Sequence, residues 1–330
     1  MEPAVIELSK LTKQYGEFTA VNALDLKIRP GEIYGLLGPN GAGKTTTILM
    51  MLGLTEPTSG TVRVCGIDAT RSPLLVKRRV GYMPDDIGFY EDRSALDNLI
   101  YTARLNRIPL PEARDRAELL LQQVGLAHAA GKRVGAFSRG MRQRLGLADV
   151  LIKRPEIIIL DEPTLGIDPE GVRELLLLIR ELSRSEGLTV LLSSHHLHQV
   201  QQICDRVGLF VGGKLIASGD IESLSRQLDG DTRFEVEVDV RDPDGSVAGR
   251  IGSMDGVISI ETSPSDALSP GANSVSTYRV TSDVELTSAL ALAVVEHGAP
   301  LLGLRPVRAG LDDIYHRYFE GGAAHERVDG

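Results

Sequence analysis

The sequence predicts an α/β protein, and three observations support this prediction. Residues 38–46 form a glycine-rich segment between an apolar run at 33–37 and a helix-forming run at 47–53 that stops at a glycine. A second apolar run, residues 157–160, leads into two carboxylates, the pattern of a buried parallel strand whose carboxyl end faces a ligand. With 330 residues, the chain is long enough for two domains.

The glycine-rich segment fits the phosphate-loop pattern G-x-x-x-x-G-K-[ST]. Its glycines let backbone N–H groups turn toward an anion, and the start of the following helix adds partial positive charge. Lys44 can reach the β- and γ-phosphates, and the Thr45 hydroxyl can ligate Mg²⁺. The segment therefore predicts a P-loop NTPase core that binds ATP and Mg²⁺. The expected ATP-binding residues are Gly38, Pro39, Asn40, Gly41, Ala42, Gly43, Lys44, Thr45 and Thr46.

Composition narrows the classes of function. A net charge of −9 is a poor match for non-specific nucleic-acid binding, so we expect no nucleic-acid partner. The two cysteines, Cys65 and Cys204, form no C-x-x-C pair, which favours a reducing compartment and argues against a zinc site. No apolar run approaches the roughly 18 residues of a membrane span, and the first residues do not resemble a secretory signal. Any crossing of a membrane would then be made by another chain.

The N-terminal region predicts an antiparallel sheet beside the nucleotide core. Residues 5–8, 20–28 and 61–64 have the composition of strands, and turn residues separate them. Tyr15 falls in the first of these turns. Its ring could stack on an adenine or simply pack in the turn, and both interpretations stay open.

Residues 86–150 are expected to form a helical subdomain. A short strand ending at a proline, residues 79–85, precedes it, and Pro109 and Pro111 divide its first helical stretch, residues 94–124, into two helices. Two apolar stripes are predicted, one of Leu96, Leu99 and Ile100 and one of Leu119, Leu120 and Val124.

Residues 137–145 open a further helix with Ser138 at a suitable N-cap position. A serine hydroxyl beside free N–H groups can bind an anion, although an ordinary capped helix explains the same pattern.

The acids after the second apolar run are candidates for metal binding and catalysis. Asp161 can hold Mg²⁺ through water, and Glu162 can orient or deprotonate an attacking water. A further buried strand at 188–192 leads to His195, which could contact the γ-phosphate from the strand end. Metal binding by His195 and His198 is disfavoured, because no cysteine or carboxylate stands at ligand spacing.

The order of these motifs resembles the ATP-binding subunit of an ABC transporter over residues 4 to 225. The resemblance implies an adenine-stacking aromatic, a Walker A loop at 38–46, a signature motif that meets the γ-phosphate of the opposite subunit, a Walker B acid, a catalytic carboxylate, a D-loop and a switch histidine. The resemblance makes Tyr15 the adenine-stacking aromatic, and it places the signature motif at Ser138, Arg139, Gly140 and Met141. It makes Asp161 the Walker B acid and Glu162 the catalytic carboxylate. Asp168 then belongs to the D-loop, and His195 is the switch histidine.

Two departures from the family pattern are informative. The signature reads Phe-Ser-Arg-Gly-Met from Phe137 instead of Leu-Ser-Gly-Gly-Gln, a variant similar to the subfamily that serves ABC-2 type exporters. The Q-loop position, which usually carries a glutamine, is Asp85. A carboxylate is still a suitable Mg²⁺ ligand, so Asp85 joins Thr45 and Asp161 in the expected metal set.

The resemblance implies an ATPase subunit that dimerises with a second copy and drives export through a separate membrane permease. We therefore expect it on the cytoplasmic face of the inner membrane as a peripheral protein. The alternative is a non-transport ABC ATPase of DNA repair or translation. Repair members carry a long coiled coil before the signature and translation members carry two tandem cassettes, and neither pattern is present here. A module that binds ATP without turnover would be expected to lack Glu162.

The composition changes after residue 228, which we take as the end of the ATP-binding domain. Strict alternation over 234–240 predicts a strand with one wet face. A small α+β domain is expected over 229–320, with a disordered tail at 321–330. Its further elements are strands at 277–280 and 301–304, a helix at 284–296 and a loop at 263–274. Residues 311–315 resemble the closing helix of ABC-2 exporter ATPases.

Overall fold

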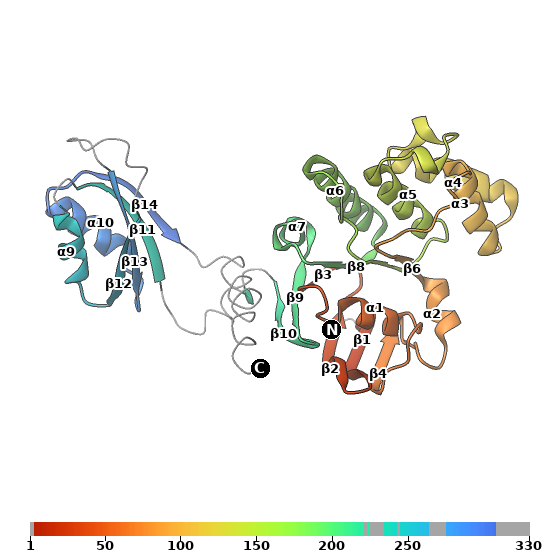
Figure 1. Ribbon diagram of the computed structural model, residues 1–330, viewed down its shortest axis with the longest axis horizontal. Coiled ribbons are helices and arrows are strands. Elements are labelled where there is room, and N and C mark those ends of the chain that lie inside the picture. Colours follow the sequence, from red (N-terminus) through yellow and green to blue (C-terminus); the bar gives the residue numbers. More distant parts are fainter. Residues whose placement is uncertain (1–2, 221–222, 225–233, 243–244, 264–274, 308–330) are drawn as a thin grey trace. The chain divides into compact units, whose positions relative to one another are not determined.

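A computed structural model describes residues 3–220, 223–224, 234–242, 245–263 and 275–307 (Figure 1). The chain divides into two compact units, of which the first extends to residue 221 and the second covers 222–321. The domain boundary predicted after residue 228, the closing helix at 311–315 and the tail at 321–330 lie outside the described residues.

The first unit is built on a six-stranded sheet of order β10-β9-β3-β8-β7-β6. The strands from β9 to β6 are parallel, and β10 pairs antiparallel with β9 at the edge. Every residue of β3, β7 and β8 is buried, which explains the apolar sequences of β3 and β7 and the apolar centre of β8, residues 190–192. The strands are β3 (Ile33–Leu37), β6 (Val80–Met83), β7 (Ile157–Leu160), β8 (Thr189–Ser194), β9 (Arg206–Val211) and β10 (Lys214–Gly219).

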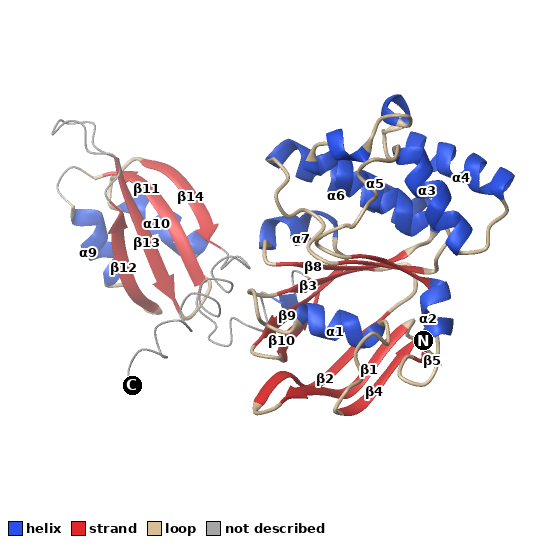
Figure 2. Cartoon of the chain, turned by 45° about the vertical axis from the view of Figure 1, so that its right-hand side comes forward, coloured by secondary structure: helices blue, strands red, loops and turns tan. Residues whose placement is uncertain are grey.

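A smaller sheet of order β2-β1-β4-β5 covers one side, as expected from the N-terminal strands. Helix α1 (Lys44–Met51) lies between the two sheets (Figure 2), where Ile48, Met50 and Met51 join side chains of both in one core. Tyr15 ends β1 instead of lying in the turn, and it pairs with Phe18 across Gly16 and Glu17. The strands are β1 (Ile6–Tyr15), β2 (Phe18–Ile28), β4 (Ser59–Val64) and β5 (Ile67–Asp68).

Helices cover the opposite face of the large sheet, with α5, α6 and α7 nearest to it (Figures 1 and 2). The predicted break at the prolines is present, but Pro111 lies inside the first turn of α4, where its missing N–H is tolerated. The helices on this face are α3 (Ala95–Leu105), α4 (Leu110–Gln123), α5 (Arg139–Leu151), α6 (Pro169–Glu186) and α7 (Leu197–Ile203), with short 3-10 turns at Ala127–Ala129 and Val134–Ala136. Helix α2 (Pro73–Arg79) lies on the other side, where Val76 joins the core that includes the smaller sheet.

The second predicted stripe is wrong at Leu119, whereas Leu120 and Val124 are buried as expected. Leu119 is 54% exposed, whereas Leu121 is 1% exposed and packs on the buried face of α4 with Ala113 and Ala117. Three consecutive leucines do not define the phase of a helix, and the small alanines that do were not counted as apolar markers.

The second unit has the order β11-α9-β12-β13-α10-β14 and an antiparallel sheet of order β12-β13-β11-β14, a ferredoxin-like arrangement. Val236, Val238 and Val240 alternate inward and pack against Ile251 of α9 and Leu290 of α10. The predicted strands and helix are present, but α9 and β12 were missed. The elements are β11 (Phe234–Arg241), α9 (Ser246–Gly252), β12 (Val257–Ser263), β13 (Val275–Ser282), α10 (Thr287–Glu296) and β14 (Leu301–Val307).

Among the described residues, no helix combines the length and apolar character that a membrane crossing requires.

Candidate nucleotide site

The phosphate loop begins directly after β3 and is shaped by two close approaches of the backbone. A Cβ on Gly38 would lie 2.2 Å from the Phe210 carbonyl oxygen, and one on Gly43 would lie 2.2 Å from that of Ala20. Gly43 also has a φ of 100°, a conformation that side chains rarely adopt. Glycine is therefore required at both positions, whereas a Cβ on Gly41 would meet open space and only its φ of 79° favours glycine there.

Lys44 lies inside this loop, with its side chain 6% exposed. Its ammonium donates to the carbonyl oxygens of Gly38 at 2.6 Å and Pro39 at 3.2 Å. The same nitrogen is 3.2 Å from Oε1 of Glu162. The predicted phosphate ligand and the predicted catalytic carboxylate are thus in contact.

Asp161 accepts two hydroxyl hydrogen bonds, one on each carboxylate oxygen. Thr45 Oγ1 donates to Oδ2 at 2.9 Å, and Ser193 Oγ donates to Oδ1 at 2.5 Å. Burial raises the pKa of Asp161, while the two hydroxyl contacts act in the opposite direction. Ser193 was missed from the sequence, although a polar residue ending the apolar run of β8 is a signal that could have identified it.

Glu162 is held by its neighbours in an uncommon backbone conformation. Its φ is 47°, in the left-handed region, and such a conformation persists only where surrounding contacts fix it. Its N–H donates to Ser193 Oγ at 3.0 Å, and Oε2 lies 2.9 Å from Nδ1 of His195. The carboxylate therefore bridges Lys44 and His195.

The strand order explains why these residues meet. β8 lies between β3 and β7, so the segments that follow the three strands share one edge of the sheet. Asp85, two residues after the end of β6, reaches the same edge from the next strand along. The ring of His195 contacts the ring of His196, with centroids 3.9 Å apart. Among the described residues, no three His, Cys, Asp or Glu side chains form a group that could hold a metal ion.

A pocket of about 510 Å³ opens at this edge. Phe18 lines it and is 63% exposed, so this ring was missed as a candidate base contact. Tyr15 is not among the lining residues, and its ring lies 4.8 Å from the Lys13 ammonium. The lining consists of Phe18, Ala20, residues 39–46, Asp85, Glu162, Leu165 and His195.

None of the four predicted signature residues, 138–141, lines this pocket. Ser138 caps α5 by accepting a hydrogen bond from the Met141 N–H at 3.3 Å, and Gly140 leaves room around its backbone. Neither Ser138 nor Gly140 lines the pocket of its own chain. Arg139 turns back and donates to the Leu165 carbonyl oxygen, and Asp168 caps α6.

Comparison with known proteins decides the family. The chain is 41% identical to the bacitracin transport ATP-binding protein BcrA of Bacillus licheniformis over 223 residues, which is 68% of this chain and 72% of that protein. It is 36% identical to the linearmycin resistance ATP-binding protein LnrL of Bacillus subtilis over 234 residues, 71% of this chain and 75% of that protein. The chain belongs to the ABC transporter family. Residues 21–165 match the ABC transporter family pattern.

Solved structures agree with this family and with the predicted fold. The structure of cbiO1 from Clostridium perfringens, described as part of the ABC transporter complex cbiONQ, matches with a TM-score of 0.63 and 26% identity. The match covers 69% of this chain and 95% of cbiO1. The predicted P-loop core with its antiparallel and helical subdomains is therefore confirmed.

As an ABC transporter ATP-binding subunit of the ABC-2 exporter group, the chain is an ATPase. BcrA is a transport ATP-binding protein, which disfavours the repair and translation alternative. The longest helix between α1 and α5 is the 14-residue α4, too short for the long coiled coil of a repair ATPase.

Proposed function

We propose that two copies of this ABC transporter subunit close on two ATP molecules and drive export through a separate membrane permease. One observation carries the proposal. Lys44, Glu162 and His195 face one pocket, while Ser138 and Gly140 of the same chain lie outside it. A second copy would bring its signature residues to that pocket, and a permease would hold both copies at the cytoplasmic face of the membrane.

Different residues of the chain would carry out different steps of ATP hydrolysis. The ammonium of Lys44 and the backbone N–H groups of the loop would bind the phosphates. Glu162 would orient the attacking water and take its proton, and His195 would hold the Glu162 carboxylate through the 2.9 Å contact. The name of LnrL, a resistance protein, supports export as the direction of transport.

The donor set fits Mg²⁺, which prefers oxygen ligands. Thr45 Oγ1 and the Asp161 carboxylate already touch at 2.9 Å, and the Asp85 carboxylate borders the same pocket. Bound there, the metal would neutralise charge on the β- and γ-phosphates. Phe18 and Tyr15, which pair across one turn, are the two candidates to stack on the adenine.

The test is the Glu162→Gln variant. Because the loop and Lys44 are intact, ATP binding should persist, while phosphate release should fall by about 10²–10⁴-fold with the loss of the base. With hydrolysis blocked, light scattering should show twice the monomer mass when ATP is added. Glu181→Gln, exposed on α6, is the matched control and should turn over normally. A Glu162→Gln chain that stays monomeric at saturating ATP, with or without its permease, would refute the dimer.

A further inference from the structure

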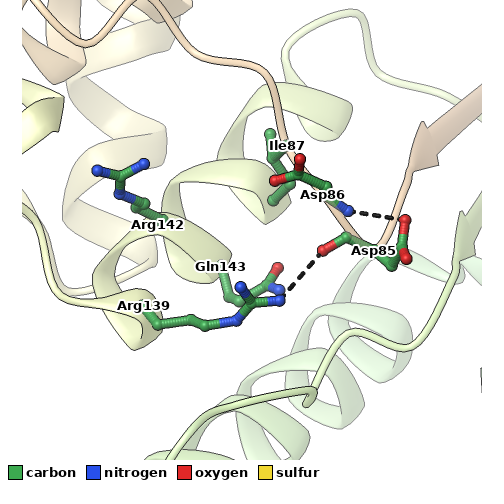
Figure 3. Close-up of a pocket in the computed structure, with 6 residues that line it drawn as sticks. All are labelled: Asp85, Asp86, Ile87, Arg139, Arg142 and Gln143. Carbon is green, nitrogen blue, oxygen red and sulfur yellow. Dashed lines mark hydrogen bonds between the residues drawn. The ribbon is translucent and has the colours of Figure 1, made fainter.

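Arg139, the first residue of α5, contacts two loops of its own chain. Its Nε donates to the Leu165 carbonyl oxygen at 2.6 Å. Its Nη2 donates to the Asp85 carbonyl oxygen at 3.4 Å (Figure 3). The family signature has a glycine here, so this side chain is an addition to the motif. Its two neighbours, Ser138 and Gly140, make no comparable contact in the described structure with the nucleotide pocket of this chain.

The two loops are those that border the nucleotide pocket. Leu165 and Asp85 both line it, on the segments that follow β7 and β6. Both acceptors are backbone carbonyl oxygens. The contacts therefore depend on where the two loops lie and not on which side chains the loops carry. A planar guanidinium, with N–H groups pointing in fixed directions, can hold two such carbonyls at once.

The contact with Leu165 bears directly on the catalytic carboxylate. The Leu165 N–H donates to the Glu162 carbonyl oxygen at 3.1 Å, which closes a turn that starts at Glu162. That turn carries the positive φ of Glu162, a strained conformation that needs outside support. Gly166 allows the close approach, because a Cβ there would lie 2.9 Å from Arg139 Nε.

We infer that Arg139 is a positioning residue that acts within its own subunit, by holding the turn at residues 162–166 and the Asp85 loop so that Glu162 faces the phosphate loop. This inference deepens the proposed function and rests on it for the catalytic role of Glu162. Ser138 and Gly140 keep their role toward the second copy. The signature segment then serves two sites, its own through Arg139 and its partner's through the residues on either side.

The first test needs no dimer. In the nucleotide-free chain, Arg139→Ala should speed hydrogen–deuterium exchange of the amides at 165–167 several-fold. A second, smaller cavity is lined by Arg139 and Arg142 together with Asp85 and Asp86 (Figure 3). The matched control is Arg142→Ala, since Arg142 lines this cavity too but pairs with Glu91 at 2.8 Å. Its exchange at 165–167 should match wild type. Unchanged exchange in Arg139→Ala would overturn the inference, whatever the oligomeric state.

The second test separates position from binding. Arg139→Ala should lower kcat about tenfold or more while the KM for ATP changes less than twofold, because a misplaced carboxylate impairs the chemical step and leaves the phosphate loop intact. Arg139→Lys, whose ammonium can reach one of the two carbonyls, should have a kcat between those of wild type and Arg139→Ala. A raised KM with normal kcat would assign Arg139 to nucleotide binding instead and overturn the inference.

The third test decides which subunit's site Arg139 serves. In mixed dimers of a doubly substituted Arg139→Ala, Glu162→Gln chain with wild type, both changes fall on one site, and the activity should equal that of Glu162→Gln with wild type. In dimers of Arg139→Ala with Glu162→Gln, the remaining Glu162 lies beside the altered Arg139, and activity should fall about tenfold or more below that of Glu162→Gln with wild type. The reverse pattern would place Arg139 in the partner's site. If no dimer forms, the proposed function fails, while the exchange result still decides the contact.

Discussion

At the scale of single residues, Glu162 is fixed by three contacts that come from the ends of two strands, β3 and β8. Lys44 reaches it from the phosphate loop, Ser193 holds its N–H from the end of β8, and His195 contacts its other carboxylate oxygen. Asp161 beside it is fixed as closely by two hydroxyls. Asp85 differs, because its side chain is exposed and accepts only from its neighbour, the Asp86 N–H at 2.8 Å, among the contacts described.

The position of Asp85 on the nucleotide pocket leads to a prediction about metal dependence. Asp85→Asn keeps the size of the side chain and removes its charge, so the Mg²⁺ concentration for half-maximal ATPase activity should rise about three- to tenfold. Asp86→Asn is the matched control, because Asp86 does not line that pocket. Titration of activity with Mg²⁺ at saturating ATP measures both. An Asn variant with the wild-type Mg²⁺ curve would leave Asp85 as a surface acid.

At the scale of elements, helix α4 contains three consecutive leucines, residues 119–121, and packing against its neighbours decides which of them are buried. The helix starts at Leu110 with Pro109 before it, and this start places Ala113, Ala117 and Leu121 on the face toward α3 and α5. Leu119 then points to solvent. A pair of substitutions on opposite faces of the same turn, Leu119 and Leu121, therefore tests the phase of the helix.

Leu121→Ala should lower the free energy of unfolding by about 2–5 kcal/mol, because it leaves a cavity in a packed face. Leu119→Ala, with the same change in chemistry, should stay within about 0.5 kcal/mol of wild type. Urea unfolding followed by circular dichroism gives both values. Equal losses for the two variants would mean that α4 is rotated relative to the structure described.

Helix α5 carries a second testable feature, the carboxyl of Asp149. Burial raises the pKa of Asp149 to about 6, and one of its oxygens has no hydrogen-bond partner in the described structure. The folded state then binds the proton more tightly than the unfolded state, so this group favours folding at low pH and that contribution is lost as the pH rises from about 4 to 6. At pH 8 the buried charge opposes folding.

Asp149→Asn should therefore raise the free energy of unfolding at pH 8 by about 1–2 kcal/mol, a discounted value because the side chain keeps some contact with water. At pH 4 the two proteins should be nearly equal. Unfolding curves at both pH values measure the difference. A stabilisation that is the same at pH 4 and pH 8 would contradict an ionised buried carboxyl.

At the scale of the whole molecule, the chain combines a cassette with a second unit that has its own core. The valines of β11 pack against α9 and α10, and a buried hydroxyl contact from Tyr278 to Asp242, at 2.7 Å, lies in the same unit. Nothing in the catalytic set comes from this unit. The two units should therefore be separable.

We expect residues 229–320, expressed alone, to unfold in a single cooperative transition, because four strands and two helices enclose one apolar core. Residues 1–228 should keep the ATP affinity of the full chain. Thermal melts and nucleotide titrations of the two pieces measure these outcomes. A fragment 229–320 without a cooperative melt would show that its core depends on the cassette.

The sequence by itself determined the features that are local in the chain. The phosphate loop, the paired acids after a buried strand and the helix that opens at Ser138 are each set by neighbouring residues, whose backbone preferences and periodicity can be read directly. The alternation over 234–240 predicted β11 for the same reason, whereas α9 and β12 lack a comparable repeat.

Only the tertiary structure decided which distant groups touch. Ser193 reaches Asp161 across 32 residues, Lys44 reaches Glu162 from another strand end, and Arg139 turns back onto Leu165. These contacts depend on the order of β3, β8 and β7 in the sheet and on their register, which the loops between them do not encode. The choice of Leu121 over Leu119 has the same origin, since the faces against which a helix packs belong to other parts of the chain.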